Sequence, residues 1–190
     1  MPLIHLPVQS GSNKILEAMN RKHTIEEYLG IVEKLNKLNS SIRFSSDFII
    51  GYPGETLEDF KKTEKLIKNV QYINSYSFIF SARPGTPAFK LEKVNQSEAK
   101  ERLISFQSLA EEIKTKYRKT LIGEISNVLF ENKTKDGNEY FGRDEYSNSV
   151  IVKSNESLVG KIKKVKITSG NHNTLYGETS SKFKQNNYAA

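Results

Sequence analysis

The sequence predicts an α/β domain followed by a small all-β barrel, and two observations support this prediction. In the first half of the chain, short apolar runs alternate with stretches in which apolar residues recur every three or four positions, as in strands that alternate with helices. Such alternation favours a parallel sheet with right-handed crossovers. From Ile122 onward the pattern changes to five short strand-like runs separated by turn residues, which favours a five-stranded barrel of the OB kind.

The centre of the α/β domain is expected to be a strand, a tight turn and the start of a helix. The run from Phe44 to Ile50 is mostly apolar and β-branched or aromatic, as in a strand buried on both faces. A Gly-Tyr-Pro-Gly turn follows, and Thr56 with Asp59 forms a capping box. Asp47 lies within the apolar run, where a carboxylate is costly unless it is paired or close to an open strand end. The turn either binds a ligand at that end or is an ordinary loop.

Further helices are predicted from their N-terminal capping residues. Ser12 can cap a short helix, and Thr24 with Glu27 forms a second capping box before a longer one. Asn95 is expected to begin a third, amphipathic helix. Outside the central strand, the remaining strands are expected over residues 3–8, 73–80, 122–131, 138–144, 147–153, 158–169 and 173–178.

These patterns divide the chain into an α/β domain over 1–118, a barrel over 119–183 and a disordered polar tail over 184–190. Three strands cannot close a barrel, so we expect the α/β domain to be the C-terminal part of a larger, partial (β/α) barrel. No apolar run is long enough to cross a membrane and no signal peptide begins the chain, so we expect a cytoplasmic protein without a membrane partner.

The charge and the cysteine content limit the classes of partner and site. The 190 residues carry a formal net charge of +7, which favours an anionic partner, above all nucleic acid, over a merely basic protein. The sequence contains no cysteine, which excludes disulfides and any thiolate-bound metal within the chain. We therefore expect no metal ligands in this sequence.

Lysines on the fourth barrel strand suggest a surface for nucleic acid. Lys161 and Lys163 should share one face of the strand, and Lys164 and Lys166 the other. Charge on both faces suits an exposed or edge strand, and lysines that only block edge pairing are the alternative interpretation. Together with Arg143, the first three of these lysines are expected to contact RNA phosphates. By contrast, we expect the small interior of the barrel to be filled by aromatic side chains, namely Phe130 and either Tyr140 or Phe141.

Four sequence blocks, taken in order, carry a specific resemblance: His5–Ser12, Met19–Arg21, Ser45–Thr56 and Ser75–Ala88. They resemble the methylthiotransferase branch of the radical S-adenosylmethionine (SAM) enzymes, and within it the tRNA 2-methylthio-adenosine synthases. The resemblance covers roughly residues 2–179 and includes the barrel, which is similar to the RNA-binding TRAM domain of that family.

The resemblance implies a fold and a function. The fold is a partial (β/α) radical SAM barrel whose fourth to sixth strands come from residues 2–90, followed by a TRAM barrel. The function is the addition of a methylthio group to carbon 2 of a prenylated adenosine next to the anticodon, with a tRNA anticodon stem-loop as the partner. The alternatives are relatives that act on threonylcarbamoyl-adenosine in tRNA or on a ribosomal protein, and a non-catalytic RNA-binding module.

The resemblance also implies which residues contact S-adenosylmethionine: Gln9, Ser10, Arg21, Asp47, Gly51 and Arg83. Arg21 offers a forked donor to a carboxylate, and Gln9 can bind an amine or a ribose. Asp47 can accept hydrogen bonds from two ribose hydroxyls, while Gly51 lets the backbone approach the ligand. Taken singly, each has a plainer interpretation, such as a helix-end cation, a strand cap or a turn residue.

In this family the chemistry depends on two four-iron four-sulfur (4Fe-4S) clusters that cysteines hold. A reduced cluster cleaves S-adenosylmethionine to a 5′-deoxyadenosyl radical, and a second cluster supplies sulfur. Because this chain contains no cysteine, its sequence departs completely from the family at this point. We expect the cluster ligands to lie in a missing N-terminal part of the same enzyme, and the chain to be inactive by itself.

Overall fold

The computed structural model describes residues 1–135 and 137–179, so the predicted tail over 184–190 lies outside the described residues. Contacts between Cα atoms divide the chain into two compact units. One comprises Ile4–Lys114, and the other comprises the residues from Thr115 onward together with Met1–Leu3. A functional boundary between residues 118 and 119 stays a prediction.

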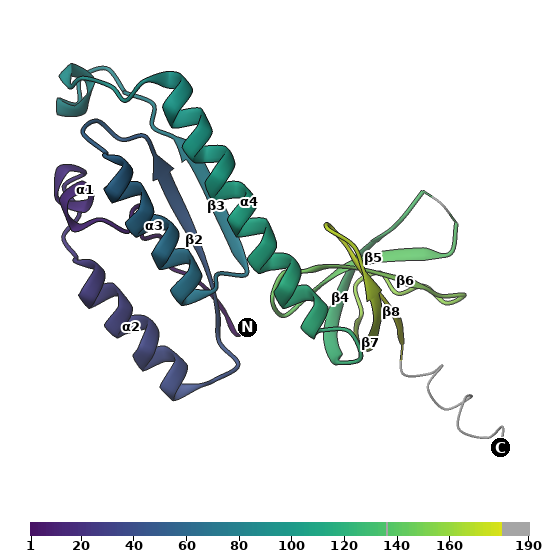
Figure 1. Cartoon of the computed structure of the whole chain (residues 1–190). Coiled ribbons are helices and arrows are strands. Elements are labelled where there is room, and N and C mark those ends of the chain that lie inside the picture. Colours follow the sequence, from purple (N-terminus) through teal and green to yellow (C-terminus); the bar gives the residue numbers. More distant parts are fainter. Residues whose placement is uncertain (136, 180–190) are drawn as a thin grey trace. The chain divides into compact units, whose positions relative to one another are not determined.

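The first unit alternates strands and helices along the chain, as Figure 1 shows. Its elements are β1 (Leu3–His5), α1 (Asn13–Ala18), α2 (Ile25–Leu38), β2 (Arg43–Ile50), α3 (Leu57–Val70), β3 (Asn74–Ile79), the 3₁₀ helix η1 (Pro87–Lys90) and most of α4 (Gln96–Thr120). The three strands form one sheet in the order β1-β2-β3. β2 and β3 are parallel, and a parallel bridge between Gln9 and Phe48 continues the pairing on the other side of β2. The predicted parallel α/β architecture is confirmed.

The helices cover one face of this sheet and leave the other face more open. Phe44, Phe48 and Ile50 of β2 point to the helical side and are buried in one apolar cluster with side chains of α2, α3 and α4. On the opposite side, Asp47 is only partly buried, and Tyr76 of β3 is 54% exposed. The prediction that β2 is buried on both faces is therefore wrong for the part of the chain that the structure describes. The strand separates an apolar core from an accessible face.

Short-range sequence signals determine where α2 and α3 begin. Thr24 and Glu27 form the predicted capping box at the start of α2, and Thr56 and Asp59 form the other at the start of α3. The prediction for Ser12 is only half right. This residue occupies the N-cap position of α1, but its side chain makes no capping hydrogen bond, because the hydroxyl donates to Asp59 instead. The physical reason is that α3 offers a charged acceptor at 2.7 Å.

The second unit contains a closed barrel of five short strands, as predicted. They are β4 (Ile125–Lys133), β5 (Glu139–Asp144), β6 (Ser149–Lys153), β7 (Ile162–Gly170) and β8 (Leu175–Thr179). Their order around the barrel is β4-β5-β6-β8-β7, and the β6–β8 pair is parallel whereas the other pairs are antiparallel. Phe130 and Tyr140 are buried inside, which confirms that aromatic residues fill the interior.

Closure of the barrel corrects one expectation about β7. This strand pairs with β4 on one side and with β8 on the other, so it is not an edge strand. Its lysines cannot serve to block edge pairing, because a closed barrel leaves no edge to protect.

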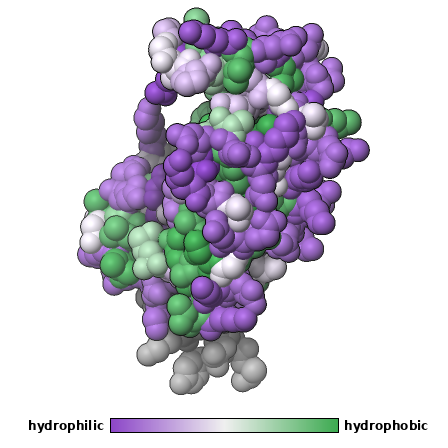
Figure 2. Space-filling model, turned by 90° about the vertical axis from the view of Figure 1, so that its left-hand side faces the viewer, coloured by the Kyte–Doolittle hydropathy of each residue, from purple (hydrophilic) through white to green (hydrophobic). Residues whose placement is uncertain are grey.

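Hydrophilic residues cover most of the molecular face that the space-filling view presents, with smaller hydrophobic areas among them (Figure 2). None of the helices in residues 1–135 and 137–179 is long and apolar enough to span a membrane.

Candidate functional site

A cavity of about 450 Å³ lies on the open side of the first unit, where β2 and β3 end. Three of the residues predicted to contact S-adenosylmethionine line it, namely Gln9, Asp47 and Arg83. Apolar and aromatic side chains, among them Ile49, Phe78 and Phe80, complete the wall. A cavity with one carboxylate, one guanidinium and aromatic walls suits a ligand that has a polar and a planar apolar part.

Gln9 occupies its place in the cavity wall through its backbone. Its φ of 74° is left-handed, a conformation that costs a residue with a side chain about 1 kcal/mol or more. The residue is 7% exposed. Hydrogen bonds to β2 hold it there, since its N–H donates to the carbonyl of Asp47 at 3.0 Å and its carbonyl accepts from the N–H of Ile49 at 2.9 Å. The strained backbone is therefore fixed by the neighbouring strand.

Asp47 presents its carboxylate on the open face of β2, where His5 of β1 lies beside it. The His5 Nε2 atom is 3.4 Å from Asp47 Oδ2. On the other side of the imidazole ring, Nδ1 is 2.9 Å from the hydroxyl of Ser45. The sequence predictions included Asp47 but missed His5, because only strand pairing shows that the two side chains meet.

Arg83 extends from the loop after β3 and is exposed. A tight turn fixes its backbone. Its carbonyl accepts hydrogen bonds from the N–H and the hydroxyl of Thr86, at 3.2 and 2.7 Å, and Gly85 between them adopts a φ of 84°. Within the described residues, the guanidinium has no hydrogen-bond or ion-pair partner, so it can bind an anionic group that enters the cavity.

The other three predicted contact residues do not line the cavity. The Ser10 hydroxyl accepts from the N–H of Ser12 and lies 3.4 Å from the Thr63 hydroxyl. Arg21 is exposed after the end of α1. Gly51 has a φ of 72°, and a β-carbon at this position would lie 2.8 Å from that of Ala99 in α4. The structure thus gives Gly51 a packing role, and its predicted approach to a ligand remains a prediction.

Residues of two of the motif blocks, Ser12 and Thr56, both form hydrogen bonds with Asp59 at the start of α3. The Ser12 hydroxyl donates to Asp59 Oδ1 at 2.7 Å, and Oδ2 of the same carboxylate accepts from Thr56 and from Lys14. Burial alone would raise the pKa of Asp59, but hydrogen bonds from Ser12, Thr56 and Lys14 outweigh it and hold that pKa well below its usual range. Gly11 packs against this helix so closely that a β-carbon would lie 2.5 Å from the Lys62 carbonyl.

A buried ion pair holds the turn after β2 against α4. Arg102 Nη1 is 2.8 Å from Glu55 Oε1, which also accepts the N–H of Gly51 at 3.0 Å. Arg102 also pairs with Glu98 one helical turn earlier. Burial raises the pKa of Glu55 despite these partners. The sequence analysis missed this pair, because its members are 47 residues apart.

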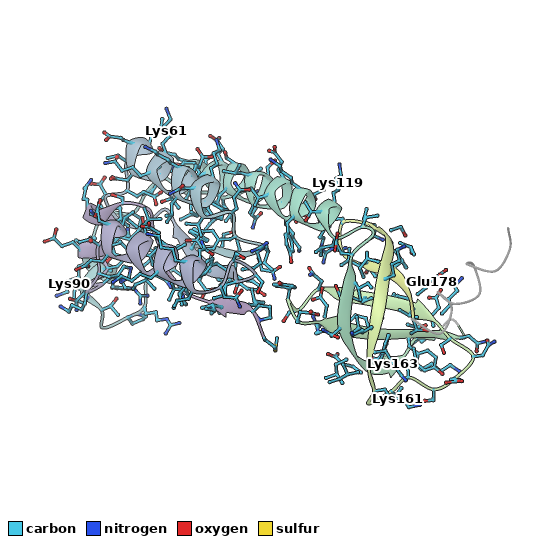
Figure 3. All side chains as sticks on the ribbon, turned by 90° about the horizontal axis from the view of Figure 1, so that it is seen from below. Lys61, Lys90, Lys119, Lys161, Lys163 and Glu178 are labelled. Carbon is cyan, nitrogen blue, oxygen red and sulfur yellow. The ribbon has the colours of Figure 1, made fainter. Side chains whose placement is uncertain are left out.

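The four predicted RNA contacts lie on the barrel around β4. Arg143 is exposed on β5, where its Nε is 3.3 Å from Glu131 Oε1 and its guanidinium carbon is 5.4 Å from the centre of the Phe141 ring. On the opposite side of β4, Lys163 and Lys164 of β7 pair with Val128 and Asn127. Lys161 precedes β7, and Figure 3 shows its label next to that of Lys163 at the same end of the barrel.

The three lysines are all exposed, but they do not share one face. Lys161 and Lys163 are four and two residues before the buried Val165, so they lie on the side of the strand that faces the barrel interior. Because both lysines are nevertheless exposed, they extend from the end of the barrel. Lys164 lies on the outer face, where the exposed Leu129 and Ile162 pair with each other across β4 and β7. The structure thus brings the four cations to one region around β4, interspersed with apolar side chains.

Comparisons with known proteins agree with this architecture. The model of the Radical SAM superfamily matches residues 1–67, and the TRAM domain model matches residues 119–179. A protein of Pelagibacter ubique named tRNA-2-methylthio-N(6)-dimethylallyladenosine synthase is 56% identical over 185 residues, which are 97% of this chain and 42% of that protein. Proteins with the same name from Wolbachia pipientis subsp. Culex pipiens and Buchnera aphidicola are each 47% identical, over 93% and 92% of this chain and 41% and 40% of their own length. The chain therefore contains a Radical SAM segment and a TRAM domain, and over nearly its whole length it is similar to part of these synthases.

The chain spans about two fifths of the length of the curated relatives that it matches. Among solved structures, the archaeal Methanocaldococcus infernus Elp3 with an N-terminal deletion matches 74% of this chain and 47% of its own, with 18% identity and a TM-score of 0.44.

The matches imply two kinds of cofactor, S-adenosylmethionine and iron–sulfur clusters, and the side chains of this chain suit only the first. The sequence has no cysteine, and within the described residues no group of three or more His, Asp or Glu could hold a metal ion. The chain therefore supplies no ligands for an iron–sulfur cluster. The cavity between Gln9, Asp47 and Arg83, by contrast, offers the hydrogen-bonding groups and aromatic walls that a nucleoside needs.

Proposed function

We propose that this chain holds S-adenosylmethionine and contacts tRNA within a radical SAM enzyme that methylthiolates carbon 2 of a prenylated adenosine next to the anticodon. The name shared by relatives of 45 to 56% identity supports this proposal. The chain acts together with another part of the enzyme, which carries the cluster ligands, in the cytoplasm where tRNA is modified. The single observation that supports the proposed binding of S-adenosylmethionine is the cavity that Gln9, Asp47 and Arg83 line together.

In this cavity the two oxygens of Asp47 accept hydrogen bonds from the ribose hydroxyls. Arg83 binds the carboxylate of the methionine half, and the Gln9 amide binds its amine or the ribose. Phe78 and Phe80 provide the apolar wall for the adenine. When bound, S-adenosylmethionine supplies the radical and methyl chemistry, and the residues of this chain bind and orient it.

The cofactor half is tested by calorimetric titration of the 190-residue chain with S-adenosylmethionine. We expect Asp47→Ala to weaken binding by about 1.5–3 kcal/mol, because it removes a charged acceptor of hydrogen bonds. The exposed Glu58→Ala on α3 is the matched control and should bind as the parent does. Arg21→Ala shows whether the site extends to the end of α1. Binding that is unchanged in both Asp47→Ala and Arg21→Ala would place the cofactor elsewhere.

The RNA half is supported by the TRAM match and by the exposed cations around β4. Arg143, Lys161, Lys163 and Lys164 can neutralise phosphates, which supply most of the affinity of such surfaces. Leu129 lies between Arg143 of β5 and β7, and Phe141 lies beside the Arg143 guanidinium, so both side chains can contact bases that are splayed out of a loop. We therefore propose a tRNA anticodon stem-loop as the partner of the barrel.

Changing these four cations together to Gln should weaken binding of an anticodon stem-loop and flatten its salt dependence. The slope of log K against log salt should fall by roughly 0.7–0.9 per lost phosphate contact. A variant with Gln at Lys34, Lys37, Lys61 and Lys65 removes the same charge from α2 and α3, and should keep most of the affinity. Fluorescence anisotropy at several salt concentrations measures both variants. If the barrel variant is folded and binds as tightly at low salt, the RNA surface lies elsewhere.

Two other substrates were open from the sequence, threonylcarbamoyl-adenosine in tRNA and a ribosomal protein. The names of the relatives favour the prenylated adenosine. Binding of the barrel to a ribosomal protein in preference to a stem-loop would reverse this choice.

A further inference from the structure

The open face of the sheet carries a side-chain arrangement that the proposed cofactor contacts do not include. His5 of β1 lies between two residues of β2, with Nδ1 2.9 Å from Ser45 Oγ and Nε2 3.4 Å from Asp47 Oδ2. Ser45 and Asp47 are two residues apart on one strand and therefore point to the same face. The ring of Tyr76, which pairs in register with Asp47, meets the His5 ring edge to face at 6.2 Å.

This arrangement fixes the imidazole ring from two sides. Ser45 is 4% exposed, so its hydroxyl is a buried and therefore well-placed partner for Nδ1. The donor and acceptor roles of Nδ1 and the Ser45 hydroxyl depend on the tautomer; in the tautomer in which the hydroxyl donates, Nε2 carries the ring proton and faces Asp47 Oδ2 at 3.4 Å. The side chain of Asp47 is 33% exposed, and no other described residue bonds to its carboxylate. His5 is thus the group that limits how the carboxylate turns.

We propose that His5 is a positioning residue that holds Asp47 by one oxygen, Oδ2, so that the other oxygen faces a ribose in the cavity. The inference rests on the proposed function of that cavity, because it assigns Asp47 to a nucleoside. The ligand class is a nucleoside with an intact ribose diol. A carboxylate with one oxygen already tied loses less conformational freedom when the other binds a hydroxyl.

The test compares two probes, adenosine and 2′,3′-dideoxyadenosine, which differ only in the ribose diol. Each is titrated into the 190-residue chain and its variants, with amide NMR shifts as the readout, which also show that each variant is folded. The parent chain should bind adenosine on the order of tenfold more tightly than the dideoxy probe. His5→Ala should lose most of that preference through weaker binding of adenosine, with the affinity for the dideoxy probe unchanged.

Two conservative variants separate positioning from a merely structural role. The side-chain amide of Gln can place a donor near the position of Nε2, so His5→Gln should keep the preference for adenosine. The shorter His5→Asn reaches only the position of Nδ1 and should behave like His5→Ala. His172→Gln, the same exchange at an exposed histidine of the barrel unit, is the control and should match the parent.

The outcomes separate this inference from the function on which it rests. A parent chain that binds neither probe overturns the proposed cavity function and the role of His5 with it. A parent that prefers adenosine while His5→Ala keeps the full preference overturns the positioning role alone. Rescue by His5→Asn but not by His5→Gln also overturns it, because the contact would then run through the other nitrogen.

Discussion

At the scale of single residues, Asp59 connects two stretches of sequence that are far apart. Its carboxylate caps α3 through Thr56 and accepts a hydrogen bond from Ser12, which precedes α1. Lys14 adds a partly exposed ion pair at 3.2 Å. The motif around Ser12 therefore serves the packing of the sheet against α3, and only its neighbour Gln9 reaches the cavity.

Asp59 should make the stability of the chain fall in acid. In the unfolded chain its pKa is about 3.8, and in the folded chain the hydrogen bonds hold its pKa lower. The stability that the ionised form contributes is therefore fully present above the unfolded pKa and is lost as the pH falls through the folded pKa. Asp59→Asn should lower the unfolding free energy at pH 7 and flatten its decrease below about pH 4.5.

Urea unfolding followed by circular dichroism between pH 3 and 7 measures this effect. The neighbouring Glu58→Gln is the control, because its side chain is 81% exposed. An acid-induced decrease that is equally steep in Asp59→Asn and in the parent would contradict the assignment.

Single residues also show what the sequence could and could not predict. Capping residues act over three positions, so Thr24 with Glu27 and Thr56 with Asp59 were identified correctly from the sequence. The hydroxyl of Ser12 could bond either to its own helix or to a distant acceptor, and nothing local decides between them. The contact of His5 with Asp47 depends on which strands are neighbours, which the residue pattern alone does not state.

At the scale of elements, α4 is tied to the turn after β2 by a buried charge. The side chains of Arg102 and Glu55 are 6% and 1% exposed, and the same carboxylate holds the N–H of Gly51. Removing one partner of such a buried ion pair is costly, because the remaining charge is then buried without a counter-ion and without water.

Arg102→Met should therefore lower the unfolding free energy by about 3–5 kcal/mol, since it leaves Glu55 buried and unpaired. The double variant Arg102→Met with Glu55→Gln should recover a large part of the loss, because it leaves no buried charge. Chemical denaturation of both variants measures the difference. Equal destabilisation in the single and the double variant would show that Arg102 acts by packing and not by charge.

Elements were easier to predict than the contacts between them. The alternation of strands and helices and the five barrel strands followed from periodicity, which is a property of each segment. The two wrong expectations, a doubly buried β2 and an edge position for β7, concern what lies beside a strand. Burial of β2 depends on which elements cover its second face, and the position of β7 depends on closure by β8.

At the scale of the whole molecule, the cysteine-free sequence restricts what the chain can do without a partner. We expect no iron–sulfur absorbance after reconstitution with iron and sulfide, and no methylthiolation of tRNA, because no thiolate is present. The Pelagibacter ubique relative, treated in the same way, is the positive control. Visible absorption spectra and nucleoside analysis by mass spectrometry are the measurements. Stoichiometric cluster incorporation with turnover in this chain alone would contradict the expectation.

The strand order of the barrel has a consequence for synthesis on the ribosome. β8 is the last described strand, and it pairs with both β6 and β7. Because the chain emerges N-terminus first, β6 and β7 each keep an unpaired edge until Thr179 has been made, whereas the three strands of the first unit are complete much earlier. A premature stop upstream of β8 would therefore leave an open sheet that other chains can join, rather than a slightly shorter barrel.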